Sequence, residues 1–168
     1  MNPPIRSAAH RDGLWHWLGQ GVPDVLGSDH APHTIEEKAK TYPASPSGMP
    51  GVQTLVPLLL NHVAEGRLTL RRFIELTSSG PQRVFGLVGK GRIALGYDAD
   101  FTVVDLKKRW TVGKDWLASR CDWSPFEGMA LTGKAVGTII RGHRVMWEDA
   151  LANAAVGEPV RFEATEFS

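Results

Sequence analysis

The sequence has a single cysteine, Cys121, in 168 residues. One thiol cannot close an internal disulfide or build a cysteine-based metal cluster, and a chain without disulfides favours a reducing, cytoplasmic setting. No apolar run approaches the ~20 residues of a membrane-spanning helix, and the N-terminus lacks an apolar signal core. Neither sign of charge is in excess, because 19 basic residues stand against 18 acidic ones. We therefore expect no membrane partner and no nucleic-acid partner.

The most informative stretch is residues 27–33, Gly-Ser-Asp-His-Ala-Pro-His. We interpret residues 22–28, which include the apolar pair Val25 and Leu26, as a short buried strand that ends at this stretch. The strand then presents Asp29 at its tip and His33 in the loop above, and chemistry in α/β folds collects at the carboxyl ends of strands. An isolated segment of this composition is more often a polar loop, so the functional interpretation depends on its neighbours.

The flanking patterns predict helices packed on a parallel sheet. Apolar residues recur at helical spacing over 8–21, 52–63 and 69–76, and a short helix can start at Pro81. Thr34 and Glu37 have the spacing of a capping box. Residues 43–51 hold three prolines and two glycines, which is typical of a loop that closes over a ligand through its own backbone groups. A helix, a short strand and a second helix form the repeat unit of an α/β fold.

The pattern changes at Gly89. Residues 91–100 are rich in turn formers around a short strand, residues 101–106 are a β-branched run, and residues 136–140 and 144–147 predict a hairpin about Gly142 and His143. These strands belong to a small β layer. We therefore divide the chain into an α/β unit over 1–88, a β unit over 89–152 and a tail over 153–168 that lies along the surface or frays.

Four segments together resemble a known family. Residues 2–6 (Asn-Pro-Pro-Ile-Arg), 29–33 (Asp-His-Ala-Pro-His) and 46–51 (Pro-Ser-Gly-Met-Pro-Gly) resemble, in order and spacing, the last third of dihydroorotases. This family of the amidohydrolase superfamily interconverts N-carbamoyl-L-aspartate and dihydroorotate in pyrimidine synthesis. Residues 91–105 resemble the strand that leads such enzymes into a C-terminal β-sandwich. The resemblance implies that residues 1–88 are the C-terminal portion of a metal-dependent (β/α)8 TIM barrel and that 89–152 are part of a small β-sandwich.

The resemblance also implies roles for individual residues. Asp29 matches the carboxylate after the last barrel strand, which is a metal ligand and the general acid/base. The metal is one or two zinc ions, which lower the pKa of bound water towards ~7, and the carboxylate moves that water's proton. Asn2 and His33 match residues that hold the substrate carboxylate. Ser47 and Gly48 match the loop that touches the pyrimidine ring through its backbone. We interpret His30 as a supporting or packing residue.

Other parts of the implied barrel are missing from the sequence. A (β/α)8 barrel needs roughly 250 residues, and the family's His-x-His pair, carboxylated lysine and further histidines come from earlier in the fold. The sequence has no His-x-His, and its remaining histidines, at 10, 16, 62 and 143, do not lie where those ligands arise. A catalytic zinc takes about three protein ligands. We therefore expect a C-terminal fragment that binds zinc poorly and is inactive alone.

Three alternatives stay open. Allantoinase and dihydropyrimidinase or hydantoinase share the fold and the ligand carboxylate, although His33 and the loop at 46–51 favour dihydroorotase. A non-catalytic dihydroorotase-like scaffold subunit is a second alternative, against which the retention of Asp29 and His33 argues. An unrelated small α/β binding domain is the third. For a parent enzyme the resemblance implies a homo-oligomer, with aspartate carbamoyltransferase as a candidate partner.

Overall fold

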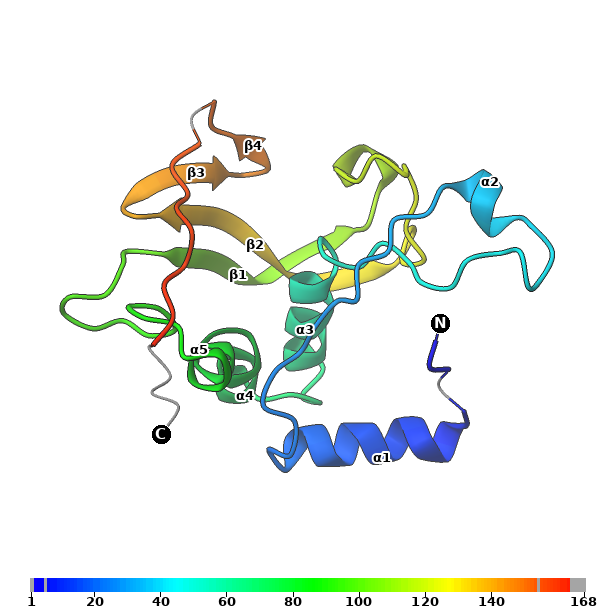
Figure 1. Ribbon diagram of the computed structural model, residues 1–168, viewed down its shortest axis with the longest axis horizontal. Coiled ribbons are helices and arrows are strands. Elements are labelled where there is room, and N and C mark those ends of the chain that lie inside the picture. The colour runs from blue at the N-terminus through cyan, green and yellow to red at the C-terminus, as the bar shows by residue number, and fades with distance from the viewer. Residues whose placement is uncertain (1, 5, 154, 164–168) are drawn as a thin grey trace.

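The structure is a computed structural model that describes residues 2–4, 6–153 and 155–163. The first half is helical, with α1 (Ala8–Gly19), α2 (Ile35–Lys38), α3 (Leu55–Ala64), α4 (Leu70–Ile74), a π-helical turn (Glu75–Ser79) and α5 (Gly80–Phe85). The second half holds β1 (Phe101–Thr111), a 3-10 turn (Lys114–Trp116), β2 (Ala130–Ile140), β3 (His143–Trp147) and β4 (Ala150–Leu151). The strands form one antiparallel sheet in the order β1-β2-β3-β4. Figure 1 shows α3, α4 and α5 below the sheet, α1 at the base and α2 standing apart.

Side-chain caps explain where several helices begin. The side chains of Ser7, Thr34 and Thr69 each accept a backbone N–H from the first turn of α1, α2 and α4. Thr34 and Glu37 make both hydrogen bonds of the capping box, as the sequence predicts. The predicted helices after Ser7, after Thr69 and at Pro81 are confirmed, while α3 begins three residues later than expected. The π-helical turn between α4 and α5 is a feature that the sequence analysis did not predict.

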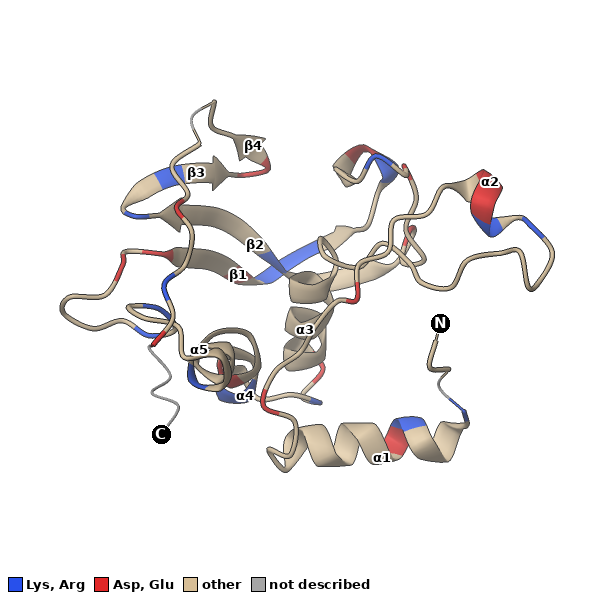
Figure 2. Ribbon diagram, in the orientation of Figure 1, with Lys and Arg blue, Asp and Glu red and all other residues tan. Residues whose placement is uncertain are grey.

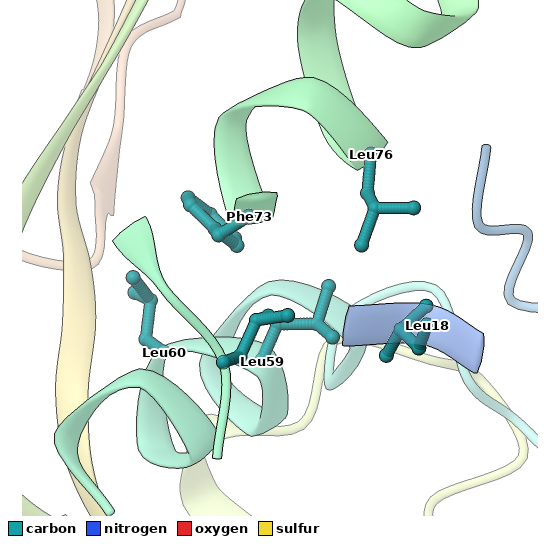
Figure 3. Packing of buried hydrophobic residues seen from close by; sticks show 6 residues of the cluster. Leu18, Leu59, Leu60, Phe73 and Leu76 are labelled. Carbon is teal, nitrogen blue, oxygen red and sulfur yellow. The ribbon is translucent and has the colours of Figure 1, made fainter. Parts of the chain in front are cut away.

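A small apolar cluster joins the helices. Figure 3 shows Leu18 of α1, Leu59 and Leu60 of α3, Phe73 of α4 and Leu76 of the π-helical turn converging on one another. All five are buried, and Leu60 and Leu76 are at most 1% exposed. Figure 2 shows that α3 carries no Lys, Arg, Asp or Glu, as suits a helix at the centre of the molecule.

Helix α3 also packs closely on the sheet. A Cβ at Gly133 of β2 would lie 2.7 Å from the Leu60 Cβ, and the φ of Gly133 is +98°, so glycine is required there. The buried Asn61 side chain accepts the Thr132 N–H at 2.9 Å and donates to the Glu65 carboxylate at 2.8 Å. These contacts fix the helical half against β2.

The segment over 22–28 is not the buried strand that the sequence predicted. Among the described residues no neighbouring strand forms a ladder with it, and the segment is half-buried to exposed. Helices hold it instead: the Leu26 N–H donates to the Leu76 carbonyl at 3.4 Å, and the Arg72 guanidinium donates to the Leu18 carbonyl at 2.9 Å and to that of Pro23. A strand of a parallel sheet needs strands beside it. The described residues therefore show helices with an antiparallel sheet, and no parallel sheet.

The β half follows the prediction in part. The hairpin is confirmed as β2 and β3, which turn at Arg141 and Gly142. The prediction of a short strand within 91–100 is wrong, because this stretch forms turns in which Gly91 and Gly96 have positive φ. The tail lies along the surface as expected over 155–163, where its backbone pairs with residues 86–88. Residues 154 and 164–168 lie outside the described residues.

Apolar side chains are exposed at several places on the helical half. Helix α3 is covered in part, since Leu59 and Leu60 are buried. Exposed apolar side chains include Val52 and Ile74, which lie in the segments 52–63 and 69–76 predicted as helices, together with Trp17, Val22 and Phe85, and each of the five is 48–63% exposed. Across the described ranges, no helix has both the length and the hydropathy needed to span a membrane.

We expect these exposed side chains to make the isolated chain self-associate or bind an apolar dye, because the free energy falls when exposed apolar surface leaves water. Sedimentation velocity and anilinonaphthalene sulfonate fluorescence measure the two effects. Exchanging Trp17 and Val22 for serine should weaken both signals. A monomer at micromolar concentration that leaves the dye unperturbed would contradict this expectation.

An ion-pair cluster fastens the turns at 89–100 to the sheet, in a region where Figure 2 shows both signs of charge. The Lys90 ammonium lies 2.9 Å from the Asp98 carboxylate and also pairs with Asp100, whose carboxylate accepts the Arg141 N–H at 2.7 Å. Hydrogen bonds to Asp100 and Asp98 raise the pKa of Lys90, and the bond from Lys90 lowers the pKa of Asp98. Burial opposes ionisation of Asp100, but the bonds from Lys90 and Arg141 lower its pKa.

We expect Asp100→Asn to lower the melting temperature by a few degrees at pH 7 and by less near pH 2. The folded pKa of Asp100 lies below its usual 3.8, so its stabilising contribution is present above that pH and is lost as the pH falls through the folded value. Thermal unfolding followed by circular dichroism at both pH values measures this. Asp12→Asn, at an exposed pair with Arg11, is the control, and an equal loss at both pH values for Asp100→Asn would refute the assignment.

Candidate active site

Asp29 stands at a sharp turn of the backbone. Its φ is +44°, in the left-handed region that aspartate tolerates better than most residues. The residue is exposed, and its carboxylate has no hydrogen bond or ion pair to any residue that the structure describes. The side chain is therefore open to a ligand on the solvent side.

The structure brings the segment 29–33 against the loop 46–51. The Ala31 N–H donates to the Met49 carbonyl at 2.9 Å, and His30 and Met49 form an isolated parallel bridge. Gly48 has a φ of +105°, and a Cβ there would lie 2.5 Å from the Ala31 Cβ. Gly48 therefore packs directly against the segment that follows Asp29, and only glycine fits so close an approach.

His30 and Lys38 hold the loop in place. The His30 Nδ1 accepts the N–H of Gly51 at 3.0 Å and faces that of Val52 at 3.4 Å, so this nitrogen carries no proton. The Lys38 ammonium donates to the Pro46 carbonyl at 2.6 Å and to the Gly48 carbonyl at 3.0 Å. The supporting role expected for His30 agrees with these contacts.

His33, Ser47 and Asn2 differ in how the structure places them. The His33 carbonyl accepts the Trp123 Nε1–H at 2.7 Å, and its imidazole lies 3.7 Å from the Glu37 carboxylate. Ser47 is exposed beside Gly48. Asn2 is exposed ahead of α1, and no hydrogen bond within the described ranges joins it to the other candidate residues. The structure thus groups Asp29, His33, Ser47 and Gly48 on two adjoining segments and leaves Asn2 apart. Ile5 of the 2–6 motif lies outside the described residues.

Two residues that the sequence analysis missed contact this site. Gln53 follows the loop at 46–51, and Trp123 comes from the connection between β1 and β2. Both line a small pocket beneath the loop, whose walls are His30, Pro50, Gly51, Gln53, Thr54, Leu117, Ser119, Trp123 and Ser124. The length of the connection between β1 and β2, residues 112–129, is the feature that could have pointed to Trp123, because strand connections of that length are often functional.

The described residues do not by themselves fit a zinc ion. In the part of the chain that the structure describes, no three His, Cys, Asp or Glu side chains are grouped so that they could hold a metal. A catalytic zinc takes three protein ligands, and Asp29 supplies one carboxylate. Any metal at this site needs ligands beyond these residues.

The comparisons with known proteins agree with this geometry. The model of the amidohydrolase family matches residues 5–145. The chain belongs to the amidohydrolase family. This family is typically metal-dependent, and the match spans both the helical half and most of the sheet.

Curated relatives confirm the resemblance to dihydroorotases. The dihydroorotase of Pyrococcus furiosus is 44% identical over 158 residues, which are 94% of this chain and 36% of the relative. That of Halobacterium salinarum is 44% identical over 161 residues, or 96% of this chain and 38% of the relative. The chain spans about a third of the length of the curated relatives it matches.

Solved amidohydrolase structures share the fold of the described residues. L-hydantoinase (dihydropyrimidinase) from Arthrobacter aurescens matches with a TM-score of 0.84 and 36% identity over 89% of this chain and 34% of its own. D-hydantoinase (dihydropyrimidinase) from a Thermus species matches with a TM-score of 0.85 and 32% identity over 90% of this chain and 34% of its own. The helices and the antiparallel sheet are thus arranged as in one third of these larger amidohydrolases.

We expect the purified 168-residue chain to retain far less than one zinc per molecule, because one carboxylate cannot replace three ligands. Metal content after dialysis against zinc, measured by inductively coupled plasma mass spectrometry, gives the ratio. Asp29→Asn should leave this low value unchanged. Stoichiometric zinc that the Asp29 variant loses would show that the chain builds a complete metal site.

Proposed function

We propose that this chain supplies part of a metal-dependent dihydroorotase, which interconverts N-carbamoyl-L-aspartate and dihydroorotate. The observation that carries the proposal is the contact between the segment 29–33 and the loop 46–51, the two motifs that resemble this family. The identity to curated dihydroorotases, up to 46%, exceeds the 36% identity to the hydantoinase of matching structure and supports the same choice.

The proposed fold explains the unpaired segment over 22–28. We place it as the last strand of a (β/α)8 barrel whose other strands lie outside the described residues, with β1–β4 as part of a small β-sandwich. Its extended backbone and its ladder-free edges support this placement. Asp29 then stands at the carboxyl end of a barrel strand, where TIM-barrel chemistry occurs.

Asp29 is the proposed general acid/base. Opening the dihydroorotate ring adds water to an amide carbonyl and puts a proton on the departing nitrogen. An exposed carboxylate without partners among the described residues is able to take the proton from the water and deliver it to that nitrogen. Zinc, which the resemblance implies, would take Asp29 as one ligand and need the rest from outside the described chain.

The other candidate residues are proposed to bind the substrate. The carboxylate of dihydroorotate suits the N–H donors of His33 and Asn2. The backbone N–H groups of Ser47 and Gly48 have no partner among the described residues, so they are able to donate to a carbonyl of the pyrimidine ring. The resemblance also implies that the parent enzyme is a homo-oligomer and that a carbamoyltransferase is its partner. Both stay proposals.

A hydantoinase or dihydropyrimidinase is the second candidate, since the solved structures of matching shape bear those names. A scaffold without catalysis would not need the open carboxylate of Asp29, so we favour the enzyme.

A chimeric enzyme tests the proposal. We expect Pyrococcus furiosus dihydroorotase, with its matching 158 residues replaced by this chain, to hydrolyse dihydroorotate in preference to hydantoin and allantoin. Asp29→Asn should lower kcat by roughly 10²–10⁴-fold, the usual contribution of an acid/base group. His33→Ala should raise KM by about 10-fold or more, because it removes a hydrogen bond to a charged group.

Asp12→Asn on the exposed face of α1 is the matched control and should leave the rates unchanged. Absorbance of dihydroorotate in the ultraviolet measures turnover. A folded chimera that prefers hydantoin would support the second candidate, and full activity in the Asp29 variant would remove the proposed catalytic role.

A further inference from the structure

The connection between β1 and β2, residues 112–129, bonds to His33 and to Gln53, which follows the loop 46–51. Gln53 makes two hydrogen bonds to it: the amide Nε2 donates to the Trp116 carbonyl at 2.6 Å, and the amide oxygen accepts the Ala118 N–H at 2.9 Å. Trp123 makes the third contact, since its indole N–H donates to the His33 carbonyl at 2.7 Å. The side-chain amide nitrogen and oxygen of Gln53 and the indole nitrogen of Trp123 are therefore all hydrogen-bonded.

These contacts hold two different parts of the site. Gln53 follows the loop 46–51 that carries Ser47 and Gly48, and it is two residues from the Gly51 whose N–H bonds to His30. His33 is four residues beyond Asp29. One short segment of chain therefore holds Gln53, next to the loop, on one side and His33, four residues after Asp29, on the other.

The connection is itself fastened to the sheet. Val112, at its start, is fully buried, and its N–H and carbonyl pair with the Met129 carbonyl at 3.0 Å and the Gly128 N–H at 2.8 Å. The ring of Trp116 packs edge-on against Trp110 of β1 with centroids 4.7 Å apart. Because the connection is held at both ends and at Trp116, it is able to hold Gln53 and His33 in place.

We propose that the connection 112–129 is a positioning clamp, in which Gln53 and Trp123 set the spacing between the loop 46–51 and His33. The clamp acts on the Gln53 side chain and on the His33 backbone carbonyl, and not on the substrate. Its kinetic consequence rests on the proposed function: if the substrate carboxylate meets His33 and the ring meets Ser47 and Gly48, the clamp sets the distance at which both contacts form together. Displacements of about 1 Å are enough to weaken such a fit.

Cys121 gives a readout that needs no activity. It is the single cysteine of the chain, half-buried within the clamp, with its Sγ 3.2 Å from the Ser119 Oγ. Trp123→Phe keeps an aromatic ring, although a smaller one, and removes the indole N–H. Because a lost hydrogen bond of about 1 kcal/mol shifts a local opening equilibrium several-fold, we expect Cys121 in this variant to react about 5-fold faster with dithionitrobenzoate.

Trp17→Phe, on the exposed surface of α1, is the matched control and should not change the labelling rate. Gln53→Ala should accelerate labelling, and Gln53→Glu, which keeps the acceptor for the Ala118 N–H, should do so less. Circular dichroism confirms that each variant is folded. Labelling rates equal to that of the parent chain in both Trp123→Phe and Gln53→Ala would overturn the clamp.

The chimeric enzyme distinguishes positioning from a merely structural role. We expect Trp123→Phe to raise KM for dihydroorotate about 5-fold with kcat within twofold, because the clamp governs ground-state and transition-state binding alike. A fall in kcat with KM unchanged would overturn the positioning role. If the unsubstituted chimera does not act on dihydroorotate, the proposed function fails, and the labelling rates alone then decide the clamp.

Discussion

The buried guanidinium of Arg72 is the contact on which the geometry of the site depends. Its side chain is 10% exposed, and it donates to the carbonyls of Leu18 and Pro23 while its charge faces the Glu75 carboxylate at 3.4 Å. A buried cation is costly unless its donors are satisfied, so this arrangement ties the chain between α1 and Asp29 to α4. Gly80 adds a steric constraint, because a Cβ there would lie 2.1 Å from the Asp24 carbonyl oxygen. The segment that leads to Asp29 is therefore held by helices, and no strand pairs with it in the ranges that the structure describes.

The sequence correctly predicted the features that depend on residues close together in the chain. The capping box at Thr34 and the cap at Thr69 gave correct helix starts because each depends on residues three positions apart. The strand predicted over 22–28 is unpaired in the structure because a strand is completed by its neighbours, and the described residues supply none. The site was predictable only as separate motifs: the resemblance grouped 29–33 with 46–51, whereas Trp123 and Gln53 carry no spacing signal. Their roles depend on contacts made across 90 and 65 residues of sequence.

The two halves of the chain share one core. Helix α3 packs its Leu60 against Gly133 of β2, its Asn61 caps the Thr132 N–H, and Val104 of β1 packs on the helical cluster. The boundary predicted at residue 88 stays a prediction, but the contacts across it are apolar and close. A displacement of the sheet would therefore move α3, and with it the loop 46–51 that precedes this helix. The site is coupled to the sheet through packing as well as through hydrogen bonds.

The shape of the fold cannot by itself choose between dihydroorotase and hydantoinase, because the described residues match hydantoinase structures closely while their sequence lies nearer to dihydroorotases. The choice depends on one chemical difference: dihydroorotate carries a carboxylate, and hydantoin and dihydrouracil do not. A site that offers N–H donors to a carboxylate leaves them unpaired when the substrate lacks it, and such unpaired groups give strong discrimination. His33 is a described residue that is able to present such a donor, four residues after Asp29. Under the proposed function, discrimination between these substrates depends on the position of His33, whose carbonyl accepts the Trp123 indole N–H.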